Sequence, residues 1–127
     1  EEMVMASLSD GMGISALKNA GLKLLILSKE RNPVVARRAE KLQIEVIQAC
    51  DNKLEALTEW LSKNKLPLSQ CAYVGNDIND LQCMQAVKLA IAPIDAHPQA
   101  TQAAHWRLTR AGGKGAIREL SDAIINR

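Results

Sequence analysis

Short apolar runs of strand length alternate along this chain with segments whose apolar residues have helical spacing. The clearest run is Leu22 to Leu27, which is nearly continuous and is bounded by Ser28. Continuous apolar runs are typical of strands buried on both faces of a sheet. Parallel strands need long crossover connections, which are usually helices. The alternation therefore predicts an α/β fold with a mostly parallel sheet covered by helices on both faces.

The same pattern predicts one domain over residues 1–127, with no linker or internal repeat. The expected strands are residues 3–8, 22–27, 44–47, 71–74, 89–92 and 106–108. The expected helices are residues 10–20, 32–42, 51–66, 80–86, 97–104 and a last helix from about 117. Asp10, Asn32 and Asp51 stand at helix starts, where their side chains can cap the first turn, and Gly21 stands at a helix end.

Composition and charge exclude several classes of partner. Aromatic residues are only 2% of the chain, so base-stacking platforms for nucleic acid are not expected. The 16 basic and 14 acidic residues are spread along the chain, which leaves no basic footprint for nucleic acid. No apolar run approaches the roughly 18 residues of a membrane span. Because charge is balanced, any anionic partner is expected to be small. Cys50, Cys71 and Cys83 lack CxxC spacing and are expected to be reduced packing residues, so we expect a cytoplasmic protein.

Polar side chains follow successive apolar runs, where an open parallel sheet binds its ligands. The residues that follow three of these runs are Ser28, Lys53, and the group Asn76, Asp77 and Asp80. A hydroxyl can hydrogen-bond a phosphoryl oxygen, an ammonium can neutralise it, and carboxylates can hold a hard dication beside it. The sequence therefore predicts a site for a phosphate and a divalent cation at this edge of the sheet.

Each of these residues also has an ordinary structural explanation. Ser28 could be a strand-end or capping hydroxyl, and Lys53 could be a solvated lysine in the first turn of a helix. Asp77 and Asp80 could simply favour a helix N-terminus. The order of the three groups after successive strands favours the functional interpretation.

That order resembles a known family over essentially the whole chain. Ser28, Lys53 and Val74–Asp80 resemble motifs two, three and four of the haloacid dehalogenase superfamily, which has a Rossmann-like three-layer fold. Three further stretches are similar to 3-deoxy-D-manno-octulosonate 8-phosphate phosphatases, and more so to sialic-acid 9-phosphate phosphatases and the C-terminal domains of acylneuraminate cytidylyltransferases. These stretches are Asp10–Ile14, Asn32–Ala39 and Gly112–Glu119.

The resemblance implies a magnesium-dependent phosphatase that hydrolyses a keto-sugar-acid phosphate through an aspartyl-phosphate. Ser28 would bind the phosphoryl oxygens, Lys53 would stabilise the phosphate and the intermediate, and the acidic stretch Asn76, Asp77 and Asp80 would hold Mg²⁺. Family members form tetramers, so a homotetramer is expected. The residues expected to border the substrate are Asp10, Gly11, Lys29, Arg31, Gly112, Gly113 and Arg118. The glycine loop could equally be a permissive turn before the last helix.

Two departures from the family pattern bear on this expectation. The family nucleophile is the first Asp of a DxD motif at the end of its first strand, and this sequence contains no DxD. Its opening residues resemble the hairpin after that strand, so we expect an N-terminally incomplete domain whose first central strand is missing. Strands 22–27 and 71–74 would then flank a gap, pair directly, or pair through a strand from elsewhere. Asn76 stands where family phosphatases often carry Asp, and an amide binds a hard dication less strongly.

Two other functions fit parts of the pattern. A non-catalytic tetramerisation domain attached to an acylneuraminate cytidylyltransferase would account for Asn76 and for the absent nucleophile. A response-regulator-like or other flavodoxin-like signalling domain fits the α/β pattern but explains neither Lys53 nor the stretch 75–80. The sequence immediately upstream of Glu1 would separate the phosphatase from the tetramerisation domain.

Overall fold

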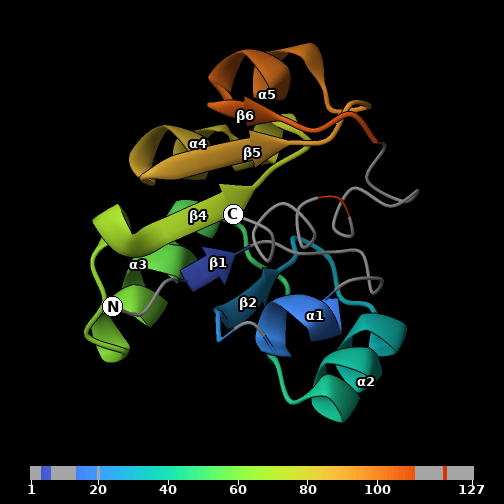
Figure 1. Ribbon diagram of the computed structural model, residues 1–127. Coiled ribbons are helices and arrows are strands. Elements are labelled where there is room, and N and C mark those ends of the chain that lie inside the picture. Colours follow the sequence, from blue (N-terminus) through green and yellow to red (C-terminus); the bar gives the residue numbers. More distant parts are fainter. Residues whose placement is uncertain (1–3, 7–13, 20, 111–118, 120–127) are drawn as a thin grey trace.

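The computed structural model describes residues 4–6, 14–19, 21–110 and 119, which form one parallel sheet with helices on both faces (Figure 1). The strand order is β3-β2-β1-β4-β5-β6, and every neighbouring pair is parallel. The strands are β1 Val4–Ala6, β2 Lys23–Leu27, β3 Glu45–Ile47, β4 Cys71–Val74, β5 Leu89–Ala92 and β6 Trp106–Arg107. The predicted fold class and the predicted strand positions are confirmed.

The helices begin and end close to the predicted positions. They are α1 Ile14–Asn19, α2 Pro33–Leu42, α3 Lys53–Lys63, α4 Leu81–Ala86 and α5 Pro98–Ala103, with 3₁₀ turns η1 Leu68–Gln70 and η2 Ile78–Asp80. Asn32 caps α2 as predicted, because its side chain accepts hydrogen bonds from the amides of Val34 and Val35. The predicted Asp51 cap is wrong: Asn52 caps α3 by accepting from the Glu55 amide. The predicted Asp10 cap and last helix lie outside the described residues, apart from Glu119, which is helical.

The central position of the sheet is filled by β1. Val4 pairs with Lys23 of β2 on one side and with Cys71 of β4 on the other, and Ala6 pairs with Leu25 and Tyr73. The expectation of a missing central strand is therefore wrong for this chain. Val4 and Ala6 are fully buried and Met5 is 2% exposed, so a short apolar segment satisfies both inner strand edges. This segment carries no carboxylate at the position where the family places its nucleophile.

Alternate residues of the strands face two separate cores. One core joins Val4, Ala6, Leu25 and Tyr73 to Leu57 and Trp60 of α3, to Met84 of α4 and to Ala100 of α5. The other joins Met5, Leu24 and Ile26 to Leu17 of α1 and Ala39 of α2. Helices α3, α4 and α5 thus cover one face, and α1 and α2 cover the other (Figure 1). This arrangement is the predicted three-layer architecture.

The three cysteines lie in the first core, and none of them forms a disulfide. Burial raises the pKa of the Cys71 thiol to about 12, with a smaller contribution from nearby Cys83. Burial likewise raises the pKa of Cys83 to about 11. Both thiols therefore stay protonated near neutral pH, which agrees with the expected packing role. Among the described residues, no helix is long and apolar enough to cross a membrane.

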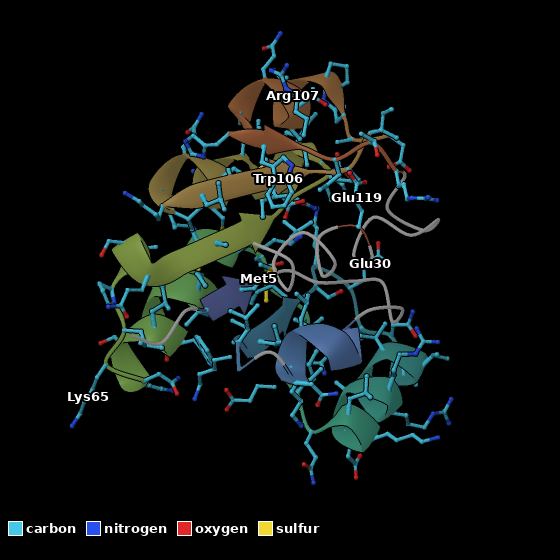
Figure 2. All side chains as sticks on the ribbon, in the orientation of Figure 1. Met5, Glu30, Lys65, Trp106, Arg107 and Glu119 are labelled. Carbon is cyan, nitrogen blue, oxygen red and sulfur yellow. The ribbon has the colours of Figure 1, made fainter. Side chains whose placement is uncertain are left out.

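The order of the strands places a ligand-binding crevice. From β1 the chain moves outward through β2 and β3, and it then returns to the other side of β1 to form β4. In open parallel sheets, ligands bind beside such a reversal, outside the carboxyl ends of the strands. Figure 2 shows Met5 in the middle of the sheet, and Glu30 and Glu119 on the side towards which the strand arrows point. The predicted site residues that the structure describes all follow strands on this side.

Candidate functional site

Ser28 directly follows β2 and connects the loops after β2 and β3 by hydrogen bonds. Its amide donates to the carbonyl of Ile47, and its own carbonyl accepts from the Cys50 amide, each at 3.0 Å. Its hydroxyl donates to the Glu30 carbonyl at 2.8 Å. Ser28 is half-buried, and its hydroxyl makes no hydrogen bond to Lys53 or Asp80 among the described residues. The hydroxyl therefore holds a local turn while it lies at the carboxyl edge.

Asp80 is the organising group of the site and is buried, with an exposed fraction of 1%. Its Oδ1 accepts from the Tyr73 hydroxyl at 2.5 Å and from Lys53 Nζ at 2.9 Å. Its Oδ2 accepts from the amides of Asn76 and Asp77 at 3.1 and 3.2 Å. A buried carboxylate is stable only when its oxygens are paired in this way. Asp80 thus fixes both the loop after β4 and the position of Lys53.

Lys53 reaches this carboxylate from the first residue of α3. Its side chain is 10% exposed, in contrast to the solvated lysine that a helix start usually presents. Besides Asp80, its ammonium donates to the side-chain oxygen of Asn79 at 3.2 Å. The structure therefore brings together two of the predicted site residues, Lys53 and Asp80, which are far apart in the sequence.

Gly75 allows the loop after β4 to pack against Asp80. A Cβ atom at this position would lie 2.6 Å from Met84 Sδ and 2.8 Å from the Cβ of Asp80. Real Cβ atoms do not approach neighbours so closely, so a larger residue would push the loop away from the carboxylate. The glycine that the sequence places directly after β4 is required by this contact.

Asn76 and Asp77 lie on the outer side of the same loop and are exposed. One Asp77 oxygen accepts from the Ile78 amide at 2.7 Å. Their oxygens are of the hard type that Mg²⁺ prefers. The described residues contain no group of three or more His, Cys, Asp or Glu side chains that could hold a metal ion. The loop therefore supplies only part of a dication site, namely the Asp77 carboxylate and the Asn76 amide oxygen. The Asp80 oxygens already accept four hydrogen bonds.

The residues expected to border the substrate are only partly described. Lys29 and Arg31 are exposed beside the Ser28 turn, at the carboxyl edge. The positions that lie outside the described residues are Asp10, Gly11, Gly112, Gly113 and Arg118. Glu119, just after the glycine loop, accepts from the amides of Thr109 and Arg110 and from the Thr109 hydroxyl at 2.9 to 3.0 Å.

These hydrogen bonds shift the titration of Glu119. Partial burial on its own raises the pKa of the carboxyl, but the hydrogen bonds from Thr109 and Arg110 and the charge of Arg110 outweigh it. The pKa of Glu119 is therefore lowered. The ionised carboxylate joins the chain after the glycine loop to the chain that leaves β6.

Tyr73, Asn79 and Glu119 were not singled out by the sequence as side chains that organise this region. The signal for Tyr73 was available, because a buried tyrosine hydroxyl usually finds a partner and this tyrosine stands in an apolar strand. No local pattern reveals that Asn79 contacts Lys53 or that Glu119 contacts Thr109. Both contacts depend on tertiary folding.

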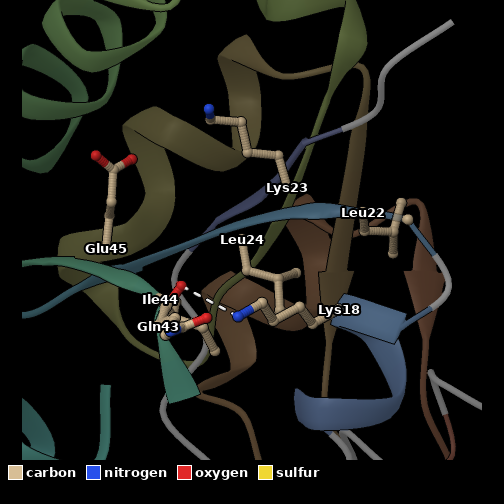
Figure 3. Close-up of a pocket in the computed structure, with 8 residues that line it drawn as sticks. Lys18, Leu22, Lys23, Leu24, Gln43, Ile44 and Glu45 are labelled. Carbon is tan, nitrogen blue, oxygen red and sulfur yellow. Dashed lines mark hydrogen bonds between the residues drawn. The ribbon is translucent and has the colours of Figure 1, made fainter. Parts of the chain in front are cut away.

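A cavity of about 380 Å³ lies at the opposite edge of the sheet, near the amino ends of β2 and β3 (Figure 3). Its lining includes Lys18, Lys23 and Glu45. The Lys18 ammonium donates to the carbonyl of Leu42 at 2.6 Å, at the end of α2. Because Ser28, Lys53 and Asp80 lie at the carboxyl edge, this cavity is separate from the candidate site.

Comparisons with known proteins agree with this arrangement. The model of the haloacid dehalogenase-like hydrolase family matches residues 17–119. A 3-deoxy-D-manno-octulosonate 8-phosphate phosphatase from Yersinia pestis is 34% identical, and the match covers 98% of this chain and 67% of the relative. N-acylneuraminate cytidylyltransferase A from Danio rerio is 32% identical over 98% of this chain, but the chain spans only 30% of that protein.

Solved structures share the fold. A 3-deoxy-D-manno-octulosonate 8-phosphate phosphatase from Moraxella catarrhalis, in complex with magnesium, phosphate and KDO, superposes with a TM-score of 0.88. That protein is 31% identical, and the match covers 98% of this chain and 84% of its own. A HAD family hydrolase from Streptomyces avermitilis is 36% identical and superposes with a TM-score of 0.86. The match covers 95% of this chain and 82% of that protein. This chain therefore belongs to the haloacid dehalogenase-like hydrolase family.

Proposed function

We propose that the intact protein is a phosphomonoester hydrolase for the phosphate of a keto-sugar acid, of the 3-deoxy-octulosonate 8-phosphate or sialic-acid 9-phosphate type. The observation that carries this proposal is the Lys53–Asp80 pair, with its 2.9 Å contact and its side chains 10% and 2% exposed. A cation held in a largely water-excluded position beside the strand reversal can stabilise a dianionic phosphoryl group. The similar octulosonate phosphatases supply the substrate class.

In this reaction Lys53 neutralises charge on the phosphoryl oxygens, and Ser28 offers its hydroxyl to one of them. Lys29 and Arg31 lie close enough along the chain to meet the carboxylate or hydroxyl groups of the sugar acid. Attack on phosphorus needs a carboxylate nucleophile to form an aspartyl-phosphate. Because the sequence has no DxD and β1 already fills the central position of the sheet, we propose that residues 1–127 are one domain and that a further segment of the intact protein brings this pair to the carboxyl ends of the strands.

A divalent cation, Mg²⁺ in this proposal, would draw charge from the phosphoryl oxygens when bound. The exposed oxygens of Asn76 and Asp77 fit such a hard ion in chemical type and would hold it. Asp80 was also expected to bind the metal, but its four hydrogen bonds give it a more direct role in holding the loop and Lys53. Among the described residues the loop supplies too few metal ligands for a complete site, which supports a metal site completed by the carboxylate pair of the further segment.

Phosphate release from a panel of phosphomonoesters tests the proposal. The intact protein should release phosphate fastest from keto-sugar-acid phosphates and should lose this activity in EDTA. A folded intact protein that releases no phosphate from any member of the panel at millimolar Mg²⁺ would refute it. Activity that survives chelation would refute the proposed metal.

A second candidate function is a non-catalytic tetramerisation domain. Its support is the match to a cytidylyltransferase over 98% of this chain, together with Asn76 and the absent DxD. The proposed homotetramer is common to both functions, so mass measurement alone does not separate them. A DxD-containing strand in the upstream reading frame favours the phosphatase, and a cytidylyltransferase domain there without a DxD favours the scaffold.

A further inference from the structure

A buried row of polar groups leads from the core to the candidate site. Tyr73, on β4, is fully buried, and its hydroxyl donates to Asp80 at 2.5 Å. Cys83, on α4, is also fully buried and forms a side-chain hydrogen bond with Tyr73. The row therefore runs from Cys83 through Tyr73 and Asp80 to Lys53.

Without other donors to Asp80, its carboxylate would neutralise most of the positive charge of Lys53. An ammonium paired with one carboxylate presents little net charge to a phosphate. Here three neutral donors, the Tyr73 hydroxyl and the amides of Asn76 and Asp77, share the carboxylate with Lys53. Of these three, only Tyr73 binds the same oxygen, Oδ1, as Lys53 does. Tyr73 thus competes directly with Lys53 for the charge on that oxygen.

We propose that Tyr73 is a positioning residue that acts through Asp80 to keep the Lys53 ammonium available to an oxyanion. This inference rests on the proposed phosphatase function for its oxyanion, but the coupling from Tyr73 to Lys53 is a property of the chain itself. Tyr73 does not touch the substrate. Its loss lets Lys53 bind Asp80 more tightly and thereby weakens phosphate binding.

The Tyr73→Phe variant removes the hydroxyl and keeps the ring in the core. The matched control is Cys71→Ala, two residues earlier on the same strand and in the same core, with no hydrogen bond to Asp80. The first readout is the NMR signal of the Lys53 ammonium and its hydrogen exchange with water. The second is the affinity for inorganic phosphate, measured by calorimetry with Mg²⁺ present.

We expect Tyr73→Phe to shift the Lys53 ammonium signal, to slow its exchange several-fold and to weaken phosphate binding about five- to tenfold. Cys71→Ala should leave the Lys53 signal as in the unmodified chain. Unchanged Lys53 exchange in Tyr73→Phe would overturn the proposal, even if phosphate affinity fell. Changed Lys53 exchange in a chain that binds no phosphate would uphold the coupling and count against the phosphatase function.

A second variant covers the case in which Tyr73→Phe fails to fold. The chain contains one tyrosine, so biosynthetic 3-fluorotyrosine replaces Tyr73 alone. Fluorine makes the phenol a stronger donor, so it should weaken the pull of Asp80 on Lys53 and speed ammonium exchange. Slower or unchanged exchange in the fluorinated chain would overturn the proposal.

Discussion

Replacing Asp80 by alanine should destabilise the chain far more than the same change at Asp77, although both residues lie in one loop. Asp80→Ala leaves four donors without an acceptor: the Tyr73 hydroxyl, the Lys53 ammonium and the amides of Asn76 and Asp77. Tyr73 is fully buried and the Lys53 side chain is 10% exposed, so water reaches them poorly. Breaking one side of a buried ion pair costs about 3–5 kcal/mol.

We therefore predict that Asp80→Ala lowers the free energy of unfolding by about 3–5 kcal/mol. That is a large share of the roughly 5–15 kcal/mol by which domains of this size are stable. Asp77 is exposed, and its side chain accepts from the Ile78 amide and, as the cap of η2, from the Asp80 amide, so Asp77→Ala should cost only about 1 kcal/mol. Urea unfolding followed by circular dichroism measures both. Equal, small losses in the two variants would refute the buried four-donor arrangement.

Three further predictions follow from other contacts. Gly75→Ala should lower the free energy of unfolding by about 1–3 kcal/mol, because the new Cβ would lie 2.6 Å from Met84 Sδ. Thermal melting measures this loss, and a melting temperature equal to that of the wild type would contradict the close contact. Glu119→Gln should remove stability that Glu119 supplies at neutral pH. Since the folded pKa is lowered, this contribution is fully present above the unfolded value near 4.5 and disappears as pH falls through the folded value. A stability difference between wild type and Glu119→Gln that stays constant to pH 2 would contradict that account. Trp60→Phe should lower the free energy of unfolding by about 1–2 kcal/mol, because Trp60 Nε1 donates to a Glu45 carboxylate at 2.7 Å. In a double-mutant cycle of Trp60→Phe and Glu45→Ala, strictly additive losses would argue against this bond.

The fold could be predicted from the sequence because its signals are local. The apolar runs at 22–27, 71–74 and 89–92 gave strands within a residue of their true bounds, and Asn32 with Pro33 marked the start of α2. The Asp51 cap failed because Asp51 and Asn52 are both good capping residues and only the backbone decides between them.

The central strand shows where reasoning by resemblance failed. The opening residues resemble a hairpin of the family, and that resemblance implies an empty central position. In this chain residues 4–6 are apolar and lie within reach of two unpaired strand edges, so they pair with both. The need to satisfy buried backbone groups decides the outcome, whichever family segment these residues resemble.

The candidate site was predicted as a set of residues but not as a set of contacts. The placement of Ser28, Lys53 and Asp80 after successive strands followed from sheet topology. The different roles of Asp77 and Asp80 could not be predicted from the sequence. Asp80 is buried and accepts from four donors, whereas Asp77 is exposed, and only the folded structure shows this difference. Asn79 and Glu119 have partners that only the folded chain brings near.

The most direct test of the proposed function is the turnover of 3-deoxy-D-manno-octulosonate 8-phosphate and sialic-acid 9-phosphate by the intact protein and two lysine variants. Lys53→Ala removes the buried cation, while Lys63→Ala on the same helix removes an exposed lysine whose side chain is 74% accessible. We predict that Lys53→Ala lowers kcat by at least about 100-fold in a protein that circular dichroism shows to be folded, because charge stabilisation of this kind is typically worth that much. Lys63→Ala should turn over both substrates at the normal rate. Near-normal turnover in folded Lys53→Ala would contradict the assignment of the buried lysine to phosphate.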